Sequence, residues 1–531
     1  MILLDASLRL RSVRLAGLLL ASMGAAAGCT TMSQPDDATV TDDGAELRQL
    51  SPAEIVGSIA LGETSAAIAY TNPPRYRALA FVGTAGASVD AWVRSTDGDA
   101  LGWIVTSSFK SVASNDDAHA GTTDAHLTAK LPATGTYYVV FRERDHESAH
   151  FTVTLGGTAG SVCPPGSTTT LRGKVFDPAG SVALPHATVY VPKDGDAALP
   201  PLSITDPLPI DALAQTKTNE RGEFALEGVP GSGKVPVVVQ RGKWRRKVMV
   251  DVPSACADNT VEDRTLRLPK NGGEGDMPHI AVTTGPVDGL ECLLRGIGVD
   301  DAEFVTGADP NGHVHLFKGY GGRLGADAST ELWGDVATLK RYDATLLGCE
   351  AQETLANKGG NAPHAMHAYL EEGGRVLAGH YQYVWFQSSP YPDFQQVVQW
   401  STSGNGGSGP YAIDTSSPSG LAFSGWLESV GAATSGTIAL TQVTRSVGAV
   451  STSVQPWLQR TGGAPVLFTF DTPLAAPKGD RRGRVAFTDF HVTGRGGPDS
   501  IGACEIAAGA LNPQQRALEY LVFDLTSALG E

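Results

Sequence analysis

Cysteine is scarce in this sequence, and positive charge is outnumbered by negative charge. Only 6 of its 531 residues are cysteines, and no two of them form a Cys-x-x-Cys pair, so a zinc ribbon is not expected. The 40 Lys and Arg residues face 56 Asp and Glu residues, which gives a formal net charge of −16. General binding to nucleic acid is therefore not expected, because contacts with phosphate need an excess of positive side chains. A Gly-x-Ser-x-Gly nucleophile turn is also missing, which removes a common hydrolase signature.

Residues 1–28 have the features of an export signal. A basic start that contains Arg9, Arg11 and Arg14 precedes an apolar run. The run ends in "AAAGCTT", where the segment 26–29 resembles the lipobox of bacterial lipoproteins. The resemblance implies cleavage before Cys29, a diacylglycerol group on its sulfur, and a lipid-anchored protein at the outer membrane or cell surface. The alternatives are an ordinary secretory signal and an uncleaved anchor.

The segment that follows the signal, residues 29–51, is polar and acidic, as in a flexible tether. Apart from Cys29, five cysteines remain, and export permits disulfide bonds. An odd number leaves at least one cysteine unpaired. Cys163 and Cys256 flank one candidate domain, so we predict a disulfide between them.

Two regions, 52–158 and 168–268, are expected to be β-sandwiches. Runs such as "SVDAWVRS" and "GTYYVVF" alternate apolar and polar residues and are separated by Gly and Asp turns. The first region contains the stretches "SNDDA" and "LPATGTYYVVF". In these stretches it resembles the bacterial pre-peptidase C-terminal domain. On Gly173, Val175 and "TNERGEF", the second resembles a carboxypeptidase-regulatory-like domain. The second resemblance implies a structural module without catalytic residues.

The pattern changes in the last region, 278–529, where short apolar runs alternate with helical patterns. "HIAVTTG", "DATLLGC" and "RVLAGHY" are typical of buried strands. The last helix is predicted to begin at Asn512 as its N-cap, with Gln515 completing a capping box. Strands that alternate with helices indicate a mostly parallel sheet with helices on both faces, an α/β flavodoxin-like, three-layer domain. Residues 401–462 interrupt this pattern and are expected to be an insertion, either a lid over the ligand edge or a spacer.

Four stretches carry a family resemblance in this region: "YDATLLGCE", "MHAYLEEGGRVLAGHY", "RGRVAFTDFHV" and the terminal "RALEYLVFDL". Together they resemble the class I glutamine amidotransferase-like superfamily, in its ThuA-like branch. Active amidotransferases carry Gly-x-Cys-x-Gly at a strand-to-turn elbow and His-x-Glu after a later strand. Here Gly379 matches, His380 stands at the nucleophile position, His491 matches the catalytic His, and Thr493 replaces the Glu. The resemblance therefore implies the fold without the activity, because nucleophilic catalysis needs Cys or Ser beside the base.

The candidate pocket consists of His380, His491, Asp489 and Glu350. Each lies at or just past the C-terminal end of an expected strand, where open α/β sheets bind ligands. A sugar or a metal ion would suit such a group; the alternative is a relic whose histidines are hydrogen-bonded in the interior. No catalytic residue, metal ligand or cofactor is assigned.

These observations predict a cell-envelope lipoprotein with a non-catalytic binding or structural role. Carbohydrate is the leading ligand class, and a polysaccharide or an envelope protein is the expected partner beside the membrane. The alternative function is a sugar-modifying or hydrolytic enzyme that uses the pocket of His380 and His491.

Overall fold

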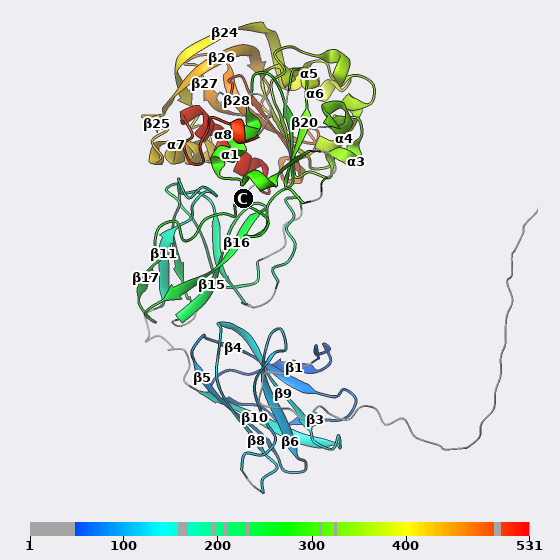
Figure 1. Ribbon diagram of the computed structural model, residues 1–531, viewed down its shortest axis with the longest axis vertical. Coiled ribbons are helices and arrows are strands. Elements are labelled where there is room, and N and C mark those ends of the chain that lie inside the picture. Colours follow the sequence, from blue (N-terminus) through cyan, green and yellow to red (C-terminus); the bar gives the residue numbers. More distant parts are fainter. Residues whose placement is uncertain are drawn as a thin grey trace, which may run out of the picture. The chain divides into compact units, whose positions relative to one another are not determined.

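Most of the described chain is β-structure arranged in several sheets (Figure 1). The computed structural model describes residues 48–119, 121–157, 168–193, 195, 198–205, 210–229, 233–306, 309, 311–322, 327–492 and 501–529. Among these residues, no helix is both long enough and apolar enough to cross a membrane. Cys29 and the expected export signal lie outside the described residues.

The first region is a β-sandwich of two antiparallel-rich sheets, ordered β1-β4-β9-β6-β7 and β2-β10-β5-β8, with β3 paired to β10. Its strands are β1 (Ile55–Ser58), β2 (Glu63–Thr64), β3 (Ile68–Tyr70), β4 (Arg77–Gly83), β5 (Ser88–Ser95), β6 (Ala100–Thr106), β7 (Ser111–Asn115), β8 (Ala125–Lys130), β9 (Gly135–Glu143) and β10 (Ala149–Gly157). The predicted alternation is confirmed, since Val89, Ala91 and Val93 of β5 all face one apolar core.

The second region also has two sheets, ordered β14-β11-β17 and β13-β12-β15-β16. Its strands are β11 (Thr170–Lys174), β12 (Thr188–Pro192), β13 (Ala212–Lys217), β14 (Glu223–Glu227), β15 (Gly233–Arg241), β16 (Trp244–Val252) and β17 (Asp258–Thr260). β15 and β16 form a long hairpin that turns at Gly242. The core of this region continues into the last region, because one cluster of buried apolar side chains includes residues of both.

The last region is built on one mixed sheet, which has twelve strands in the described chain. Its order is β19-β20-β18-β22-β23-β29-β28-β27-β24-β26-β25, with β21 paired to β20. The strands are β18 (Ile280–Thr284), β19 (Phe304–Thr306), β20 (Val314–Lys318), β21 (Asp327–Ala328), β22 (Ala344–Leu347), β23 (Arg375–Ala378), β24 (Val398–Ile413), β25 (Ala433–Thr434), β26 (Thr437–Val450), β27 (Val454–Gln459), β28 (Pro465–Thr472) and β29 (Gly483–Thr488). The pairs from β19 to β29 are parallel, and those from β29 to β25 are antiparallel.

Helices cover both faces of this sheet (Figure 1). On one face lie α1 (Leu290–Ile297), α7 (Pro418–Ser429) and α8 (Pro513–Leu525). On the other lie α2 (Ser329–Trp333), α3 (Val336–Leu339), α4 (Ala362–Glu371), α5 (Val384–Gln387) and α6 (Pro392–Val397). The central strands are rich in apolar residues because both of their faces are buried: Ile280 and Val282 pack with the first set, and Ala281 packs with the second.

Of the two helix N-caps that the sequence predicts, one forms its capping hydrogen bond and the other does not. The capping box of α8 is confirmed, since the Asn512 side chain accepts from the Gln515 N–H and the Gln515 side chain accepts from the Asn512 N–H. Asn361 does occupy the N-cap position of α4, but its amide donates to the carbonyl of Gly334 instead of capping its own helix. A tertiary hydrogen bond therefore replaced the local one.

Residues 401–462 extend the sheet. They contribute most of β24, all of β25, β26 and β27, and helix α7, so the Gly/Ser-rich stretch is a paired strand and not a spacer loop. The pairing of β24 with β26 contains several register shifts, which fits the glycines in the strand, since bulges accept residues with positive φ. The expectation of a mostly parallel sheet is correspondingly too simple, because these strands make four of the five antiparallel pairings described in this sheet.

The cysteines fall into three states among the described residues. Cys292 of α1 is bonded to Cys504, a pairing that the sequence argument did not predict. Cys349 is a free, buried thiol. Cys256 is disulfide-bonded; its expected partner, Cys163, lies outside the described residues.

Polar contacts attach the second region to the last one. The indole of Trp244 donates to Thr526 at 3.1 Å, and the indole of Trp426 donates to the carbonyl of Ala183 at 2.8 Å. Lys243 pairs with Asp343, which directly precedes β22, at 2.8 Å. The second region thus contacts the amino end of a central strand.

A buried ion cluster forms part of this contact. Arg516 of α8 pairs with Glu519 at 2.6 Å and lies 3.6 Å from Asp177, so one cation faces two carboxylates. Ser181 donates to Asp177 and accepts from Arg516. Burial raises the pKa of Asp177, and it raises the pKa of Glu519 to about 8. A proton shared by the two carboxylates therefore suits the folded state at neutral pH.

Replacing Glu519 with Gln should remove the part of the pH dependence of stability that Glu519 contributes between pH about 5 and about 8. A pKa raised above the ordinary 4.5 means that the native state holds a proton which the unfolded chain has released. The wild type should therefore lose free energy of unfolding as the pH rises through this window, by at most about 1.4 kcal/mol per unit of pKa difference. Thermal melting followed by circular dichroism from pH 5 to 9 measures this loss. The control is Gln at the exposed Glu505, and parallel pH profiles of E519Q and wild type would contradict the prediction.

Candidate functional site

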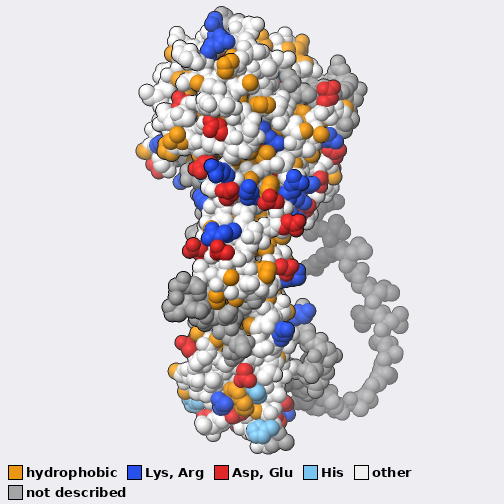
Figure 2. All heavy atoms as spheres, turned by 90° about the vertical axis from the view of Figure 1, so that its left-hand side faces the viewer, with side chains coloured by type: hydrophobic (Ala, Val, Ile, Leu, Met, Phe, Trp, Pro, Cys, Tyr) orange, Lys and Arg blue, Asp and Glu red, His pale blue; other side chains and the backbone are white. Residues whose placement is uncertain are grey.

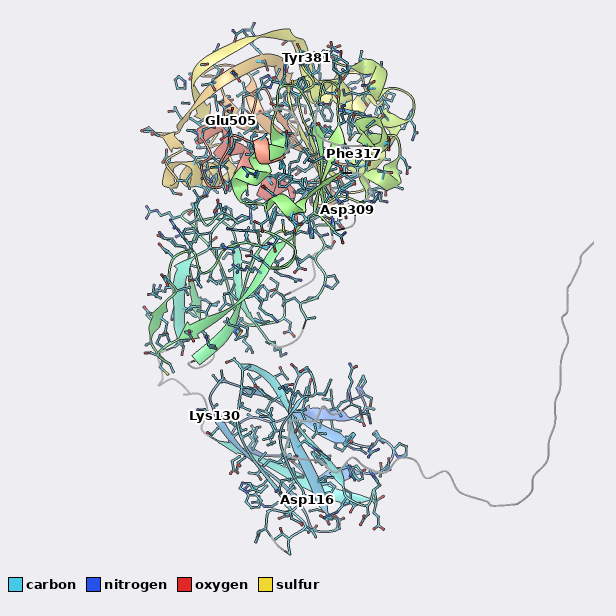
Figure 3. All side chains as sticks on the ribbon, in the orientation of Figure 1. Asp116, Lys130, Asp309, Phe317, Tyr381 and Glu505 are labelled. Carbon is cyan, nitrogen blue, oxygen red and sulfur yellow. A yellow bond between two sulfur atoms is a disulfide. The ribbon has the colours of Figure 1, made fainter. Side chains whose placement is uncertain are left out.

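The candidate site lies at the carboxyl edge of the parallel strands. Asp288 follows β18, Cys349 follows β22, His380 follows β23 and His491 follows β29. Parallel neighbours end at the same edge, so side chains far apart in sequence meet there. Figure 3 marks the direction: Asp309, before β20, and Tyr381, after β23, lie at opposite ends of these strands.

Asp288 is the central acceptor of this edge. Its side chain is 2 % exposed, and its two oxygens accept from the backbone N–H groups of Cys349, at 2.9 Å, and Val492, at 3.0 Å. It also accepts from Nδ1 of His491 at 3.1 Å. One carboxylate therefore fixes the loops after β22 and β29.

His491 has its second nitrogen, Nε2, left for the site once Nδ1 is bound to Asp288. The sulfur of Cys349 lies within hydrogen-bonding reach of the His491 ring. Burial alone would oppose a charge on this imidazole, but Asp288 and Cys349 outweigh it and raise the pKa of His491 to about 10. The ring is therefore charged at neutral pH, and the Cys349–His491–Asp288 series places it between a thiol and an orienting carboxylate.

His380 occupies the turn after β23, at the start of the 3₁₀ helix η3 (His380–Tyr383). Its side chain is almost fully buried, and within the described chain neither ring nitrogen has a hydrogen-bond partner. Its ring centroid lies 5.7 Å from that of His491. Burial, helped by the neighbouring His491, lowers the pKa of His380 to about 4, so the ring is neutral at neutral pH.

Glu350 is fully buried, and its partners lie in other segments than the two histidines. It forms an ion pair with Lys358 of the 3₁₀ helix η2 (Leu355–Lys358) and accepts from the Thr354 hydroxyl. It also accepts from the backbone N–H of Tyr320 at 2.9 Å. Burial lowers the pKa of Lys358, and the attraction of Glu350 offsets part of that effect. Glu350 therefore ties the loops after β20 and β22 together.

Asp489 is also buried, and it is held by the strand β26. It accepts from the backbone N–H of Ser446 at 3.0 Å and from the Ser446 and Thr444 hydroxyls. Burial raises its pKa, and the bonds from Ser446 offset part of that effect. The extension 401–462 thus supplies the partners of this carboxylate.

The structure brings two of the four expected pocket residues together. His380 and His491 are neighbours, whereas Glu350 and Asp489 are engaged by other segments. Two members of the cluster, Asp288 and Cys349, were missed by the sequence argument. The same rule would have found them, because "HIAVTTGPVD" and "DATLLGC" both end in a chemically active side chain just past a buried strand.

A second overlooked pattern is His146-Glu147-Ser148-Ala149-His150, which has the spacing of the His-Glu-x-x-His metal motif. That motif needs a helix to bring its histidines onto one face. Here it covers a loop and the first residues of β10, and His150 pairs with Asp97 at 2.9 Å. The pattern therefore does not form the metal site of that motif.

Two groups of side chains in the described chain have donor atoms close enough to share a metal ion. One is Cys349 with His380 and His491; the other is the partly exposed set of His367, Glu371 and Asp393. Within each group, one ligand atom from each residue lies within 4.8 Å of the others. The first group coincides with the site at the strand ends.

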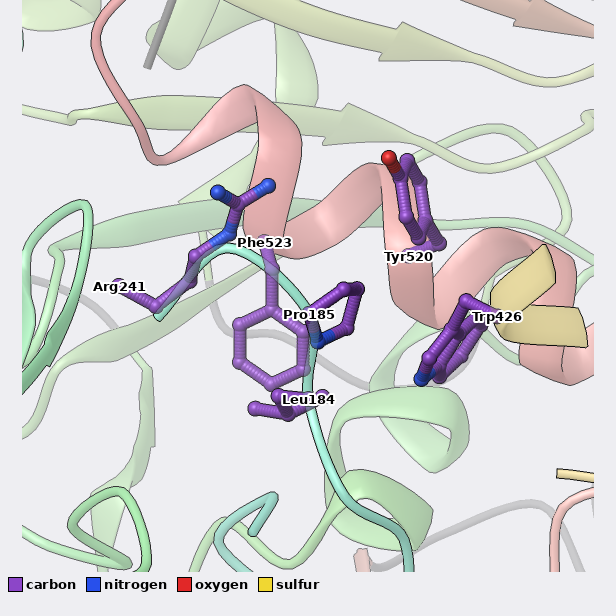
Figure 4. Close-up of a pocket in the computed structure, with 6 residues that line it drawn as sticks. All are labelled: Leu184, Pro185, Arg241, Trp426, Tyr520 and Phe523. Carbon is purple, nitrogen blue, oxygen red and sulfur yellow. The ribbon is translucent and has the colours of Figure 1, made fainter. Parts of the chain in front are cut away.

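A small cavity lies away from this edge, between the second region and the helices α7 and α8 (Figure 4). Its lining residues are Leu184, Pro185, Arg241, Trp426, Tyr520 and Phe523. Its volume of about 10 Å³ admits no more than one water-sized sphere. It is therefore a packing defect of the contact and not a substrate pocket.

Charges of both signs are interspersed on the face shown in Figure 2, where blue and red side chains lie next to one another. This face therefore presents no expanse of positive charge among its described residues. An anionic polymer would meet repulsion as well as attraction there.

Comparisons with known proteins give distant likenesses only. No family model and no curated protein matches the chain. A solved pre-peptidase C-terminal domain of a collagenase from Bacillus anthracis is 15% identical, with a TM-score of 0.17, over 20% of this chain and 99% of that chain. A ThuA-like protein from Bacteroides uniformis is 9% identical, with a TM-score of 0.28, over 46% of this chain and 89% of that chain.

A third similar structure is the periplasmic inhibitor of g-type lysozyme from Aeromonas hydrophila. It is 13% identical, with a TM-score of 0.16, over 20% of this chain and 98% of that chain. Two families expected from the sequence are thus among the structural neighbours. All three likenesses are too distant to carry a functional conclusion.

Replacing Lys358 with Met should destabilise the last region by about 3–5 kcal/mol, because it leaves the buried Glu350 carboxylate without its cation. Denaturant unfolding measures the change. The matched control is Lys340→Met, which breaks a half-exposed pair with Glu372 and should cost less than about 1 kcal/mol. Equal losses in the two variants would contradict the assigned role of the Glu350–Lys358 pair.

Proposed function

We propose that this chain is an exported envelope lipoprotein whose last region is a flavodoxin-like binding domain for carbohydrate. The ligand would lie at the carboxyl edge of the parallel strands. The observation that carries the proposal is an exposed apolar rim next to buried polar groups at that edge.

The rim consists of Tyr320 and Leu355, each 50% exposed. Both belong to segments attached to Glu350: the Tyr320 N–H donates to it, and Leu355 directly follows Thr354, whose hydroxyl donates to it. Glu350 is in turn adjacent to Cys349 of the site. A sugar ring has an apolar CH face and a hydroxylated edge, so an exposed aromatic ring beside polar groups suits it.

A lipid anchor and an export signal fit this function, because the polar segment 29–51 would let the folded regions reach polymers of the envelope. Polysaccharide or another envelope protein would be the partner. The neutral, buried His380 also fits binding better than attack on a substrate, because an imidazole there replaces the nucleophile of the resembling amidotransferases.

An enzymatic alternative rests on one specific observation, the Cys349–His491–Asp288 series. A thiol beside an imidazole that a carboxylate orients is the arrangement of thiol hydrolases. Cys349 is fully buried, so a substrate would need a local opening to reach it. Binding is therefore the leading proposal, and hydrolysis of a glycan is the alternative.

The anchor is tested by Cys29→Ala. Without the sulfur no diacylglycerol can be attached, so the protein should move from the membrane pellet to the soluble fraction after cell lysis. Immunoblots of the two fractions measure the distribution. A variant that stays in the pellet like the wild type would contradict the lipid anchor.

The binding site is tested with a panel of neutral and amino-sugar oligosaccharides titrated into the purified full chain by calorimetry. Tyr320→Ala should weaken the affinity for the best oligosaccharide about tenfold, a loss of about 1.4 kcal/mol of binding energy. The control is Leu421→Ala, an exposed apolar residue on α7, which should bind as wild type does.

Two outcomes would overturn this proposal: no oligosaccharide binds the folded chain, or Tyr320→Ala binds as tightly as wild type. New reducing ends released by the wild type, and lost with Cys349→Ala, would establish the enzymatic alternative.

A further inference from the structure

Three side chains with strong metal-binding chemistry converge at the carboxyl edge. The sulfur of Cys349 and one ring nitrogen each of His380 and His491 all lie within 4.8 Å of one another. They come from the ends of three adjacent parallel strands, β22, β23 and β29, so the sheet itself sets their spacing. The three side chains are buried, with relative exposures of 0%, 2% and 9%.

His380 provides an independent sign of a missing ligand. Both of its ring nitrogens lack a hydrogen-bond partner within the described chain, although the residue is 98% removed from solvent. An unsatisfied buried polar group destabilises the folded state, and such a group in a native protein calls for an explanation. A metal ion that accepts the lone pair of the neutral ring would satisfy one of these two nitrogens.

His491 is oriented as metal-bound histidines usually are. Its Nδ1 donates to the carboxylate of Asp288, so Nε2, once it has lost its proton, is the nitrogen left to bind a metal ion. A carboxylate behind a ligating histidine fixes the ring and its tautomer. Asp288 also holds the Cys349 backbone, so it positions two of the three donors at once.

We propose that Cys349, His380 and His491 form a binding site for a zinc-class transition metal ion. Thiolate and imidazole are the ligands that such ions prefer, and hard ions such as Mg²⁺ and Ca²⁺ take oxygen instead. Bond lengths of about 2.3 Å to sulfur and 2.0–2.1 Å to nitrogen put tetrahedral ligands about 3.3–3.6 Å apart. Side-chain movements of about one ångström are enough to close the present spacing.

Three protein ligands leave a fourth position for water or an exogenous ligand, as in catalytic zinc sites. The inference is independent of carbohydrate binding, which rests on Tyr320 and Leu355. It does decide between roles for Cys349, because a thiolate that ligates a metal is not a free nucleophile. The thiol-hydrolase arrangement assigns no role to His380, whereas in the metal site Cys349, His380 and His491 are all ligands.

The test is a metal titration of the purified full chain after treatment with a chelator. One equivalent of Zn²⁺ should bind, measured by elemental analysis after gel filtration, and it should raise the melting temperature. With Co²⁺ in place of Zn²⁺, the thiolate-to-cobalt charge-transfer band should develop together with the visible absorption of a tetrahedral ion. These bands should be lost in Cys349→Ser.

Variants assign the ligands. His380→Gln and His491→Asn should each weaken the Zn²⁺ affinity more than about 100-fold, and Asp288→Asn, which acts behind His491, should weaken it about 10–100-fold. His367→Asn, in the other group of potential ligands, is the matched control and should leave the affinity unchanged. Circular dichroism of the metal-free proteins shows whether each variant is folded.

Several results would overturn the site. The first is that folded wild-type protein binds no Zn²⁺. The second is that Zn²⁺ binding persists in both Cys349→Ser and His380→Gln. A loss of binding in His367→Asn would move the ion to the other group. If one of the ligand variants does not fold, the Co²⁺ spectrum of the wild type still decides, since a spectrum without the thiolate band excludes Cys349 as a ligand.

Discussion

The carboxyl edge of the sheet depends on one buried carboxylate, that of Asp288. Its bonds to Cys349, His491 and Val492 join the ends of β18, β22 and β29, which are up to about two hundred residues apart in the chain. The turn after β23 must pass close to it, and a Cβ at Gly379 would lie only 2.6 Å from the Asp288 oxygen. Glycine at 379 is therefore a requirement of the carboxylate, and it sets where His380 enters the cluster.

Local sequence chemistry was sufficient where a short segment determines its own structure. The capping box that begins at Asn512 and the alternation in "SVDAWVRS" involve neighbours in sequence, so both were predictable. It was insufficient where a distant segment supplies the partner. Asn361 bonds to Gly334, and the glycine-rich start of β24 is a strand only because β26 pairs with it.

The candidate site shows the same division. The rule that ligands meet at strand ends predicted that His380 and His491 would lie near each other, and their ring centroids are 5.7 Å apart. It did not predict the partners of the other two side chains. Glu350 forms an ion pair with Lys358, and Asp489 accepts a hydrogen bond from Ser446. Cys349 was not predicted, because the elbow motif aligns the nucleophile position with residue 380. In three dimensions the thiol is contributed by the neighbouring strand.

The disulfide between Cys292 and Cys504 has a consequence for how this protein would withstand proteases. The two cysteines are 212 residues apart, and the loop that they close contains every strand from β19 to β29. A single backbone cut anywhere inside that loop leaves both fragments covalently joined. Digestion would therefore go unseen on a non-reducing gel, and the severed halves would stay at high effective concentration for each other until a reductant separated them.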